Sequence, residues 1–371
     1  MSLSILPYDI LNIIIQNLDQ HDSLNFMISN NFFSALDISI HNFNISDINV
    51  LNIFFFKNIT GINLKTCNTS NLSKIFEKYN NINYIDLSLS NIAKINLSIY
   101  MCSLIHLNLC LTSISDVSFL NLCPLIENLN LQCCNIIDYK PINYLKKIKI
   151  LNLSATNISV LNFKKPLYYL EEINLSRTKI KDIRLFRLCP NLINVNISNT
   201  NVENLDVISK LKHLKDVDVT YTNVKNINNI INNDNIVKLY SSYNFISNIN
   251  YIMSPITEII IKNSKIRNFQ GFINSNFLNT INLSKNSLHK IDFLENCNEL
   301  TFLNVKNNLI NDIEPLKSLD KLINLNISHN VINSYDVLYE KKHIKKLNIS
   351  GNYGIYDKLY KLLIYTEIIN I

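Results

Sequence analysis

The sequence predicts an α/β solenoid, in which one short structural unit is stacked many times along an axis. A motif recurs every 22 residues from Ile82 to Asn352, and a fixed period of this length is the signature of a repeat architecture. Inside the motif, apolar residues alternate as they do along a half-buried strand. Positions are numbered as places from the first apolar residue of each repeat. In the clearest copy, places 1, 4, 6, 9 and 11 are Leu278, Ile281, Leu283, Asn286 and Leu288.

Thirteen copies keep this phase, with one step of 20 residues between Ile236 and Ile256. The pattern resembles the leucine-rich repeat, L-x-x-L-x-L-x-x-N-x-L. The resemblance implies one long parallel sheet on the concave face, with places 4 and 6 in the core and places 3, 5 and 7 pointing outward. Twenty-two residues leave no room for a full helix, so the convex side should be mostly 3₁₀ or extended. The first places are Ile82, Leu104, Ile126, Ile148, Leu170, Leu192, Leu214, Ile236, Ile256, Leu278, Leu300, Leu322 and Ile344.

Three regions are expected along the chain. Residues 1–34 form a small helical segment, and residues 35–352 form the solenoid, with two degenerate repeats before the thirteen regular ones. Residues 353–371 form a C-terminal cap, because Tyr356, Leu359 and Leu363 follow at helical spacing. Ile368 and Ile369 are candidates for a final strand.

The N-terminal segment does not follow the repeat. It resembles an F-box, which implies docking to the Skp-type adaptor of a cullin-RING ubiquitin ligase. The alternative is a helical cap over the first open repeat, which a solenoid requires. The residues that match the family are Leu6, Pro7, Asp9, Ile10, Leu11, Ile14, Leu18, Asp19, Asp22, Leu24, Ile28, Ser29 and Phe32. The adaptor contacts implied by the resemblance are Leu6, Pro7, Ile10, Leu11, Ile14 and Leu18.

Composition excludes several classes of function. A net charge of +6 over 371 residues is too mild and too scattered for a nucleic-acid-binding protein. No apolar run is long enough to span a bilayer, and the N-terminus has no signal-peptide pattern. Cys123, Cys189 and Cys297 share place 20, where other repeats have Leu, so they are expected to be buried thiols in a reducing compartment. These features predict a cytoplasmic protein that is monomeric outside its complex and has no membrane partner.

No catalytic constellation is apparent. With four glycines, the chain has no Gly-rich phosphate loop. His106 and Cys110 share one predicted strand face, but they are separated by about 13 Å along the strand, too far to share a metal ion directly. We therefore expect a protein that is not an enzyme and that has no cofactor and no metal site.

The outward stripe on the predicted concave face is mostly Asn at place 5 and Ser at place 7, which is typical of polar filler. It is interrupted between residues 221 and 262, where place 5 becomes Tyr and then Ile. Binding energy concentrates in aromatic and charged side chains, which favours this stretch as the partner-binding patch. The alternative is a locally decayed repeat. The predicted contact residues are Tyr221, Lys238, Tyr240, Tyr243, Ile260 and Lys262.

Together these features predict the substrate-recognition subunit of a cullin-RING ubiquitin ligase, whose repeats hold an unidentified protein target. The alternative is a non-catalytic scaffold without ligase coupling, similar to the leucine-rich repeat proteins that regulate phosphatases. A third interpretation, a secreted adhesin of the internalin type, is disfavoured by the missing signal peptide.

Overall fold

The computed structural model describes residues 39–40, 43–44, 58–59, 61–65, 72, 76, 79, 81–353 and 368–370. The F-box-like segment 1–34 and the predicted C-terminal helix lie outside these residues, so both remain predictions. The chain forms two compact units, Met1–Leu170 and Glu171–Ile371. Each unit is a leucine-rich repeat solenoid, as the repeat predicts.

The first unit is built on a parallel sheet in which each repeat adds one strand. A further pair, β1 (Ser39–Ile40) with β3 (Asn58–Ile59), is separate from that sheet. The strands of the sheet follow one another in the order β2 (Phe43–Asn44), β4 (Gly61–Asn63), β5 (Tyr84–Asp86), β6 (His106–Asn108), β7 (Asn128–Asn130) and β8 (Ile150–Asn152).

The second unit continues the same pattern, and corresponding places lie side by side in register. Its last strand is formed by the residues expected there, since Ile369 pairs with Leu347. The order is β9 (Glu172–Asn174), β10 (Asn194–Asn196), β11 (Asp216–Asp218), β12 (Lys238–Tyr240), β14 (Glu258–Ile260), β16 (Thr280–Asn282), β17 (Phe302–Asn304), β18 (Asn324–Asn326), β19 (Lys346–Asn348) and β20 (Ile368–Asn370).

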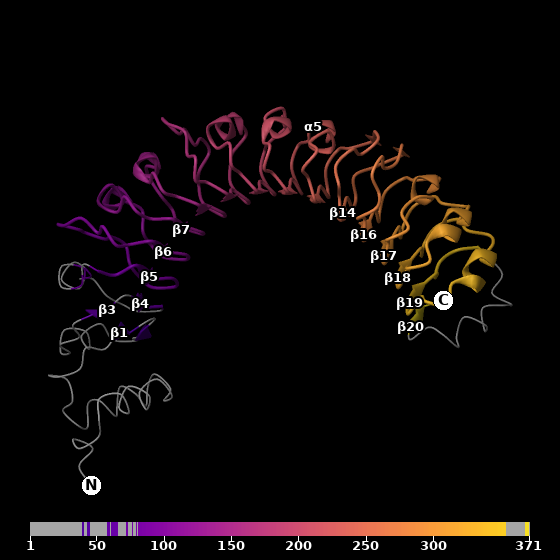
Figure 1. The fold of residues 1–371 in the computed structure, drawn as a ribbon, viewed down its shortest axis with the longest axis horizontal. Coiled ribbons are helices and arrows are strands. Elements are labelled where there is room, and N and C mark those ends of the chain that lie inside the picture. Colours follow the sequence, from indigo (N-terminus) through magenta and orange to yellow (C-terminus); the bar gives the residue numbers. More distant parts are fainter. Residues whose placement is uncertain are drawn as a thin grey trace, which may run out of the picture. The chain divides into compact units, whose positions relative to one another are not determined.

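Within each unit the strands line the inner side of the curve, and short helical turns lie on the outer side (Figure 1). The turns fall near places 15 to 19, and all but one are 3₁₀ helices, which confirms the predicted convex side. They are η3 (Ser118–Leu122), η4 (Lys140–Tyr144), η5 (Arg184–Leu188), η6 (Ile208–Lys210), α5 (Asn228–Ile231), η7 (Asp292–Leu294), η8 (Glu314–Ser318) and η9 (Asp336–Glu340).

The core consists of the apolar places that the repeat predicts. In the repeat that begins at Leu300, places 11, 14 and 17 are Ile310, Ile313 and Leu316, and all three are buried. The cysteines at place 20, including Cys189, are also buried and free. Burial of these regularly spaced apolar side chains makes the largest favourable contribution to the stability of the stacked repeats.

Place 9 closes each turn, in two different ways. Asn308 donates from Nδ2 to the carbonyls of Leu283 and Val305, at 3.0 and 2.8 Å, and accepts at Oδ1 from the Leu288 N–H at 3.1 Å. Thr178 makes one such bond, from Oγ1 to the Leu175 carbonyl. Asn308 therefore links neighbouring repeats, whereas Thr178 closes only its own turn. This confirms that the turns with Thr at place 9 are closed differently.

The 20-residue repeat replaces its helical turn with extended chain. In it β13 (Asn248–Ile249) runs parallel to β15 (Asn268–Phe269) of the next repeat, and Ile252 continues this pairing with Phe272. The deletion thus shortens the outer connection and leaves the inner sheet in register, since Tyr240 still lies beside Ile260.

Candidate functional site

The asparagines at place 5 have a structural role that the sequence interpretation of polar filler did not include. The Oδ1 of Asn326 accepts hydrogen bonds from the backbone N–H and the Oγ of Ser328, at 3.1 and 2.7 Å. The same bond to the N–H of place 7 recurs along the sheet at Asn108, Asn130, Asn152, Asn174, Asn196, Asn282, Asn304 and Asn348, and at Asp86 and Asp218. An Asx side chain at place 5 therefore satisfies an amide that the strand end leaves open.

Two consecutive repeats satisfy this amide in another way. Where place 5 is Tyr240, the Ser242 N–H donates to Thr220 Oγ1 of the preceding repeat at 3.4 Å. Where it is Ile260, the Lys262 N–H donates to Ser242 Oγ at 3.0 Å. Hydroxyls at place 7 have replaced the Asx acceptor, so place 5 is released from its structural role there. Tyr240 and Ile260 then occupy outward positions without leaving the place-7 amide unbonded.

The buried serine in the repeat that begins at Ile236 also has hydrogen-bond partners. Ser241 stands at place 6, where other repeats have an aliphatic residue, and it is buried. Its Oγ accepts from Asn244 Nδ2 at 2.9 Å, and its carbonyl accepts from Ser264 Oγ at 3.3 Å. A decayed repeat would leave such groups without partners, at roughly 1–3 kcal/mol each. The bonding therefore argues against decay as the explanation of this stretch.

Tyr240 is held in a fixed position on the sheet. Its hydroxyl donates to Glu258 Oε2 at 2.9 Å across β12 and β14. Partial burial and the neighbouring carboxylate raise the pKa of the Tyr240 phenol, so it remains a neutral hydrogen-bond donor. The ring is half-buried and keeps an accessible part on the outward face.

Tyr221 and Tyr243 lie at place 8, three residues beyond the ends of β11 and β12 respectively. Their rings stack with centroids 4.1 Å apart and planes 7° apart. Both residues have positive φ, 55° and 58°, and their N–H groups donate to the carbonyls of Ser242 and Lys262. Large side chains rarely adopt this left-handed conformation, which costs about 1–2 kcal/mol outside glycine and asparagine. The repeats hold bulky residues in a strained conformation here, and Tyr221 is 49% exposed.

The positive φ at place 8 is general and was not foreseen from the sequence. It occurs in every regular repeat because the chain must reverse there to leave the strand. The residues are Leu89, Leu111, Cys133, Ala155, Arg177, Asn199, Tyr221, Tyr243, Asn263, Lys285, Asn307, His329 and Gly351. The Asn at several of these places is the local signal that could have indicated the conformation.

The structure brings the remaining predicted residues onto the same two strands. Lys238 on β12 lies beside Glu258 in the strand register, and its Nζ is 3.9 Å from Asp216 Oδ2, a weak partly exposed ion pair. Ile260 is half-buried, and Lys262 follows at the end of β14. Tyr221, Lys238, Tyr240, Tyr243, Ile260 and Lys262 are called the tyrosine patch below. The geometry places them together, while their role in binding remains a prediction.

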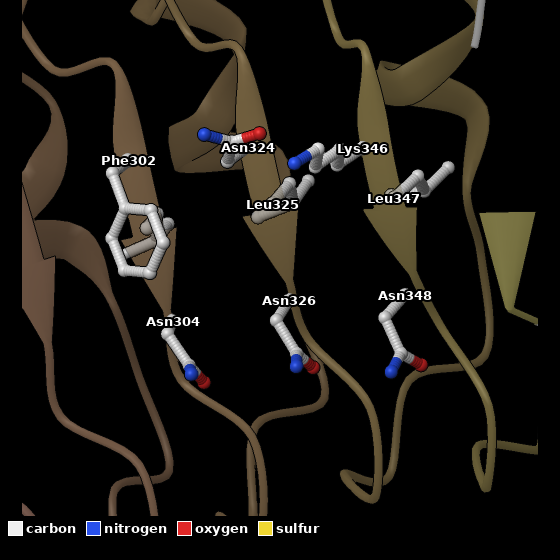
Figure 2. A pocket seen from close by; sticks show the side chains of 9 residues that line it. Phe302, Asn304, Asn324, Leu325, Asn326, Lys346, Leu347 and Asn348 are labelled. Atoms are coloured by element: carbon white, nitrogen blue, oxygen red, sulfur yellow. The ribbon is translucent and has the colours of Figure 1, made fainter. Parts of the chain in front are cut away.

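A second feature of the sheet lies outside the tyrosine patch and was missed from the sequence. A hollow of ≈ 300 Å³ opens on the face formed by β17, β18 and β19 (Figure 2). Its outward lining is one aromatic ring, one lysine and four asparagine side chains. They are Phe302, Lys346, Asn304, Asn324, Asn326 and Asn348. In the sequence, the features that could have indicated this hollow were Phe302 and Lys346, which both stand at place 3.

The described residues contain neither a metal-ligand cluster nor a membrane-spanning helix. No group of three or more His, Cys, Asp or Glu side chains within them is arranged as metal ligands would be. None of the helices among them is both long and apolar enough to cross a bilayer.

No family model matches the sequence, and no curated protein matches it either. Solved structures are similar in fold. An internalin, InlF of Listeria monocytogenes, has a TM-score of 0.68 at 21% identity, covering 84% of this chain and 87% of that one. A leucine-rich repeat protein of Leptospira interrogans reaches 0.74 at 18% identity, covering 91% and 93%. The plant peptide hormone receptor RGFR1 reaches 0.59 at 15% identity, covering 86% and 54%. At these identities the likeness establishes the leucine-rich repeat fold alone.

Proposed function

We propose that this chain is a non-catalytic, cytoplasmic recognition protein that binds a protein partner through the tyrosine patch. The observation that carries the proposal is the exchange of hydrogen-bond acceptors at β12 and β14. Place 5 loses its Asx residue in two adjacent repeats, and hydroxyls at place 7 take over the amide that Asx otherwise bonds. Coordinated replacement of this kind points to a requirement for Tyr240 and Ile260 themselves.

The patch has the composition of an interface centre. It combines three tyrosines with an aliphatic residue and two lysines, and aromatic residues are enriched at binding hot spots. Tyr240 is already ordered by its bond to Glu258, and the stacked pair Tyr221 and Tyr243 is ordered by ring contact. Side chains that are ordered before binding lose less entropy when the partner docks. RGFR1, which shares the fold, was solved in complex with RGF2.

The test compares proteins that co-purify with the tagged chain and with its variants, quantified by mass spectrometry. Tyr240→Ala together with Tyr243→Ala should reduce the recovered partner at least tenfold. The control pair, Tyr100→Ala with Tyr144→Ala, removes two tyrosines that are 63% and 56% exposed in the other unit. Equal recovery with both pairs would refute the role of the tyrosine patch, provided that circular dichroism shows each variant to be folded.

We further propose that the partner is a substrate for ubiquitin transfer, because residues 1–34 resemble an F-box. Leu6, Pro7, Ile10, Leu11, Ile14 and Leu18 would contact a Skp-type adaptor, and the repeats would present the substrate. Purified Skp adaptor should bind the full chain and lose binding when Leu6 and Pro7 are replaced by Ala. If the adaptor does not bind, or binds equally well after both replacements, the ligase role is refuted. The function would then be that of a scaffold without ligase coupling.

A further inference from the structure

The hollow on β17–β19 is rich in hydrogen-bond donors. The Oδ1 atoms of Asn304, Asn326 and Asn348 are occupied by the place-7 amides of their own turns, at 3.1, 3.1 and 3.2 Å. This fixes each side chain and leaves Nδ2 without an acceptor among the described residues. The three amides form a row in Figure 2, spaced by one strand step, about 4.8 Å. A ligand must therefore supply acceptors.

The surroundings of the hollow are positively charged. Outward places 3, 5, 7 and 8 of the four repeats that contain β16 to β19 carry no Asp or Glu. They carry Lys285, Lys306 and Lys346, and none of these lysines has an ion-pair partner within the described part of the chain. Acidic side chains lie elsewhere on the sheet of this unit, at Glu172, Asp216, Asp218 and Glu258. The charge of this face therefore selects for an anionic ligand.

The two lysines on the flanking strands bracket the amide row. Lys306 follows the end of β17, and Lys346 begins β19, two strand steps away. Their Cα atoms are thus separated by about 10 Å across the strands and about 13 Å along them. Carboxylates four residues apart on an extended chain are separated by about 13 Å, within reach of two long lysine side chains. The half-buried ring of Phe302 provides an apolar contact at one end of the hollow.

We infer that the face of β17–β19 binds an extended acidic segment of a protein partner. The carboxylates pair with Lys306 and Lys346, the Asn304, Asn326 and Asn348 amides donate to carboxylate or backbone oxygens, and Phe302 contacts an apolar side chain. The inference rests on the proposed protein-binding role but uses different strands from the tyrosine patch. Variants of the tyrosine patch and variants of β17–β19 therefore test the two proposals separately.

The test measures fluorescence anisotropy with two labelled synthetic peptides, (Glu-Ser)₅ and its neutral counterpart (Gln-Ser)₅. The full chain should bind the acidic peptide at least tenfold more tightly. Lys306→Glu with Lys346→Glu should weaken that binding at least tenfold. Lys290→Glu with Lys317→Glu makes the same charge change at two exposed lysines outside the sheet, and it should change the affinity less than threefold.

A third variant separates the amide row from general electrostatics. Asn326→Asp keeps the acceptor that the Ser328 amide needs, since Asp86 and Asp218 already fill this role in other repeats. It removes the Nδ2 donor and adds a charge that repels a carboxylate. We expect an unchanged unfolding temperature and at least tenfold weaker acidic-peptide binding. Equal binding of both peptides, equal loss with the Lys290 and Lys317 control, or tighter binding of a dT₁₀ oligonucleotide than of (Glu-Ser)₅ would each overturn the inference.

Discussion

Replacing Asn308 by Ala should destabilise the second unit far more than replacing a buried threonine at the same place of another repeat. Asn308 is 6% exposed, and Thr178 is also 6% exposed, so the two substitutions differ mainly in hydrogen bonds. Asn308 makes three good bonds, two of them to the neighbouring repeat, whereas Thr178 makes one within its own turn.

The magnitude follows from which groups lose their partners. The carbonyls of Leu283 and Val305 keep a second donor, from Asn286 and Asn330 respectively. The amide of Leu288, a residue only 1% exposed, keeps none. One orphaned amide costs about 1–3 kcal/mol, and each of the two other bonds contributes about 0.5–1.5 kcal/mol. Asn308→Ala should therefore cost about 2–6 kcal/mol, and Thr178→Ala about 1 kcal/mol.

Urea unfolding followed by circular dichroism gives the global loss, since the chain has no tryptophan to report by fluorescence. Hydrogen exchange of peptides that cover residues 283–310 gives the local loss and should show faster exchange at Leu288. Asn308→Thr should fall between the two alanine variants. If Asn308→Ala and Thr178→Ala destabilise equally, or if the Leu288 amide stays protected, the argument that asparagine links neighbouring repeats is wrong.

Two further predictions concern titratable groups. Burial alone would raise the pKa of Asp86, but the Ser88 hydrogen bonds and the Lys65 ammonium hold it below its usual value. The stability that this shift contributes is present above the unfolded-state pKa of Asp86 and is lost as pH falls through the lower folded-state pKa. The unfolding temperature of Asp86→Asn should therefore depend less on pH below about 4 than that of the unmodified chain. Equal pH dependence of the two proteins would contradict the argument. Burial also raises the pKa of the Cys189 thiol to about 12. Iodoacetamide at pH 8 should therefore modify exposed Cys102 and spare Cys189 in the native protein, as read by peptide mass spectrometry, and early modification of Cys189 would show that the site is open.

The repeat period alone determined the fold of the described residues. Places 4, 6 and 11 are apolar in nearly every copy, and burial of such residues depends on hydropathy and spacing, both of which are visible in one sequence. Even the altered closure of the turns at Thr178 and its counterparts could be expected, because a hydroxyl offers fewer bonds than an amide. The F-box-like segment was also identified from the sequence, and it stays a prediction because it lies outside the described residues.

Part of the candidate site could likewise be foreseen. The sequence singled out Tyr240 and Ile260 because they interrupt the Asn stripe, and the structure places them side by side on β12 and β14. The sequence could not show whether this interruption is a degenerate repeat or a binding surface. The distinction depends on which atoms accept hydrogen bonds from the backbone amides of Ser242 and Lys262. One acceptor belongs to a residue 22 positions away and the other to a residue 20 positions away.

The sequence by itself thus determined which residues are buried and in what order the strands stack. Only the tertiary structure decided the rest. It showed that Asn at place 5 has a structural partner, that place 8 reverses the chain with positive φ, and that three amides form a row on β17–β19 with a lysine on either side. The physical reason is that burial is a property of each residue within its own repeat. Hydrogen bonds and charge on the sheet face instead arise between residues that only stacking brings together.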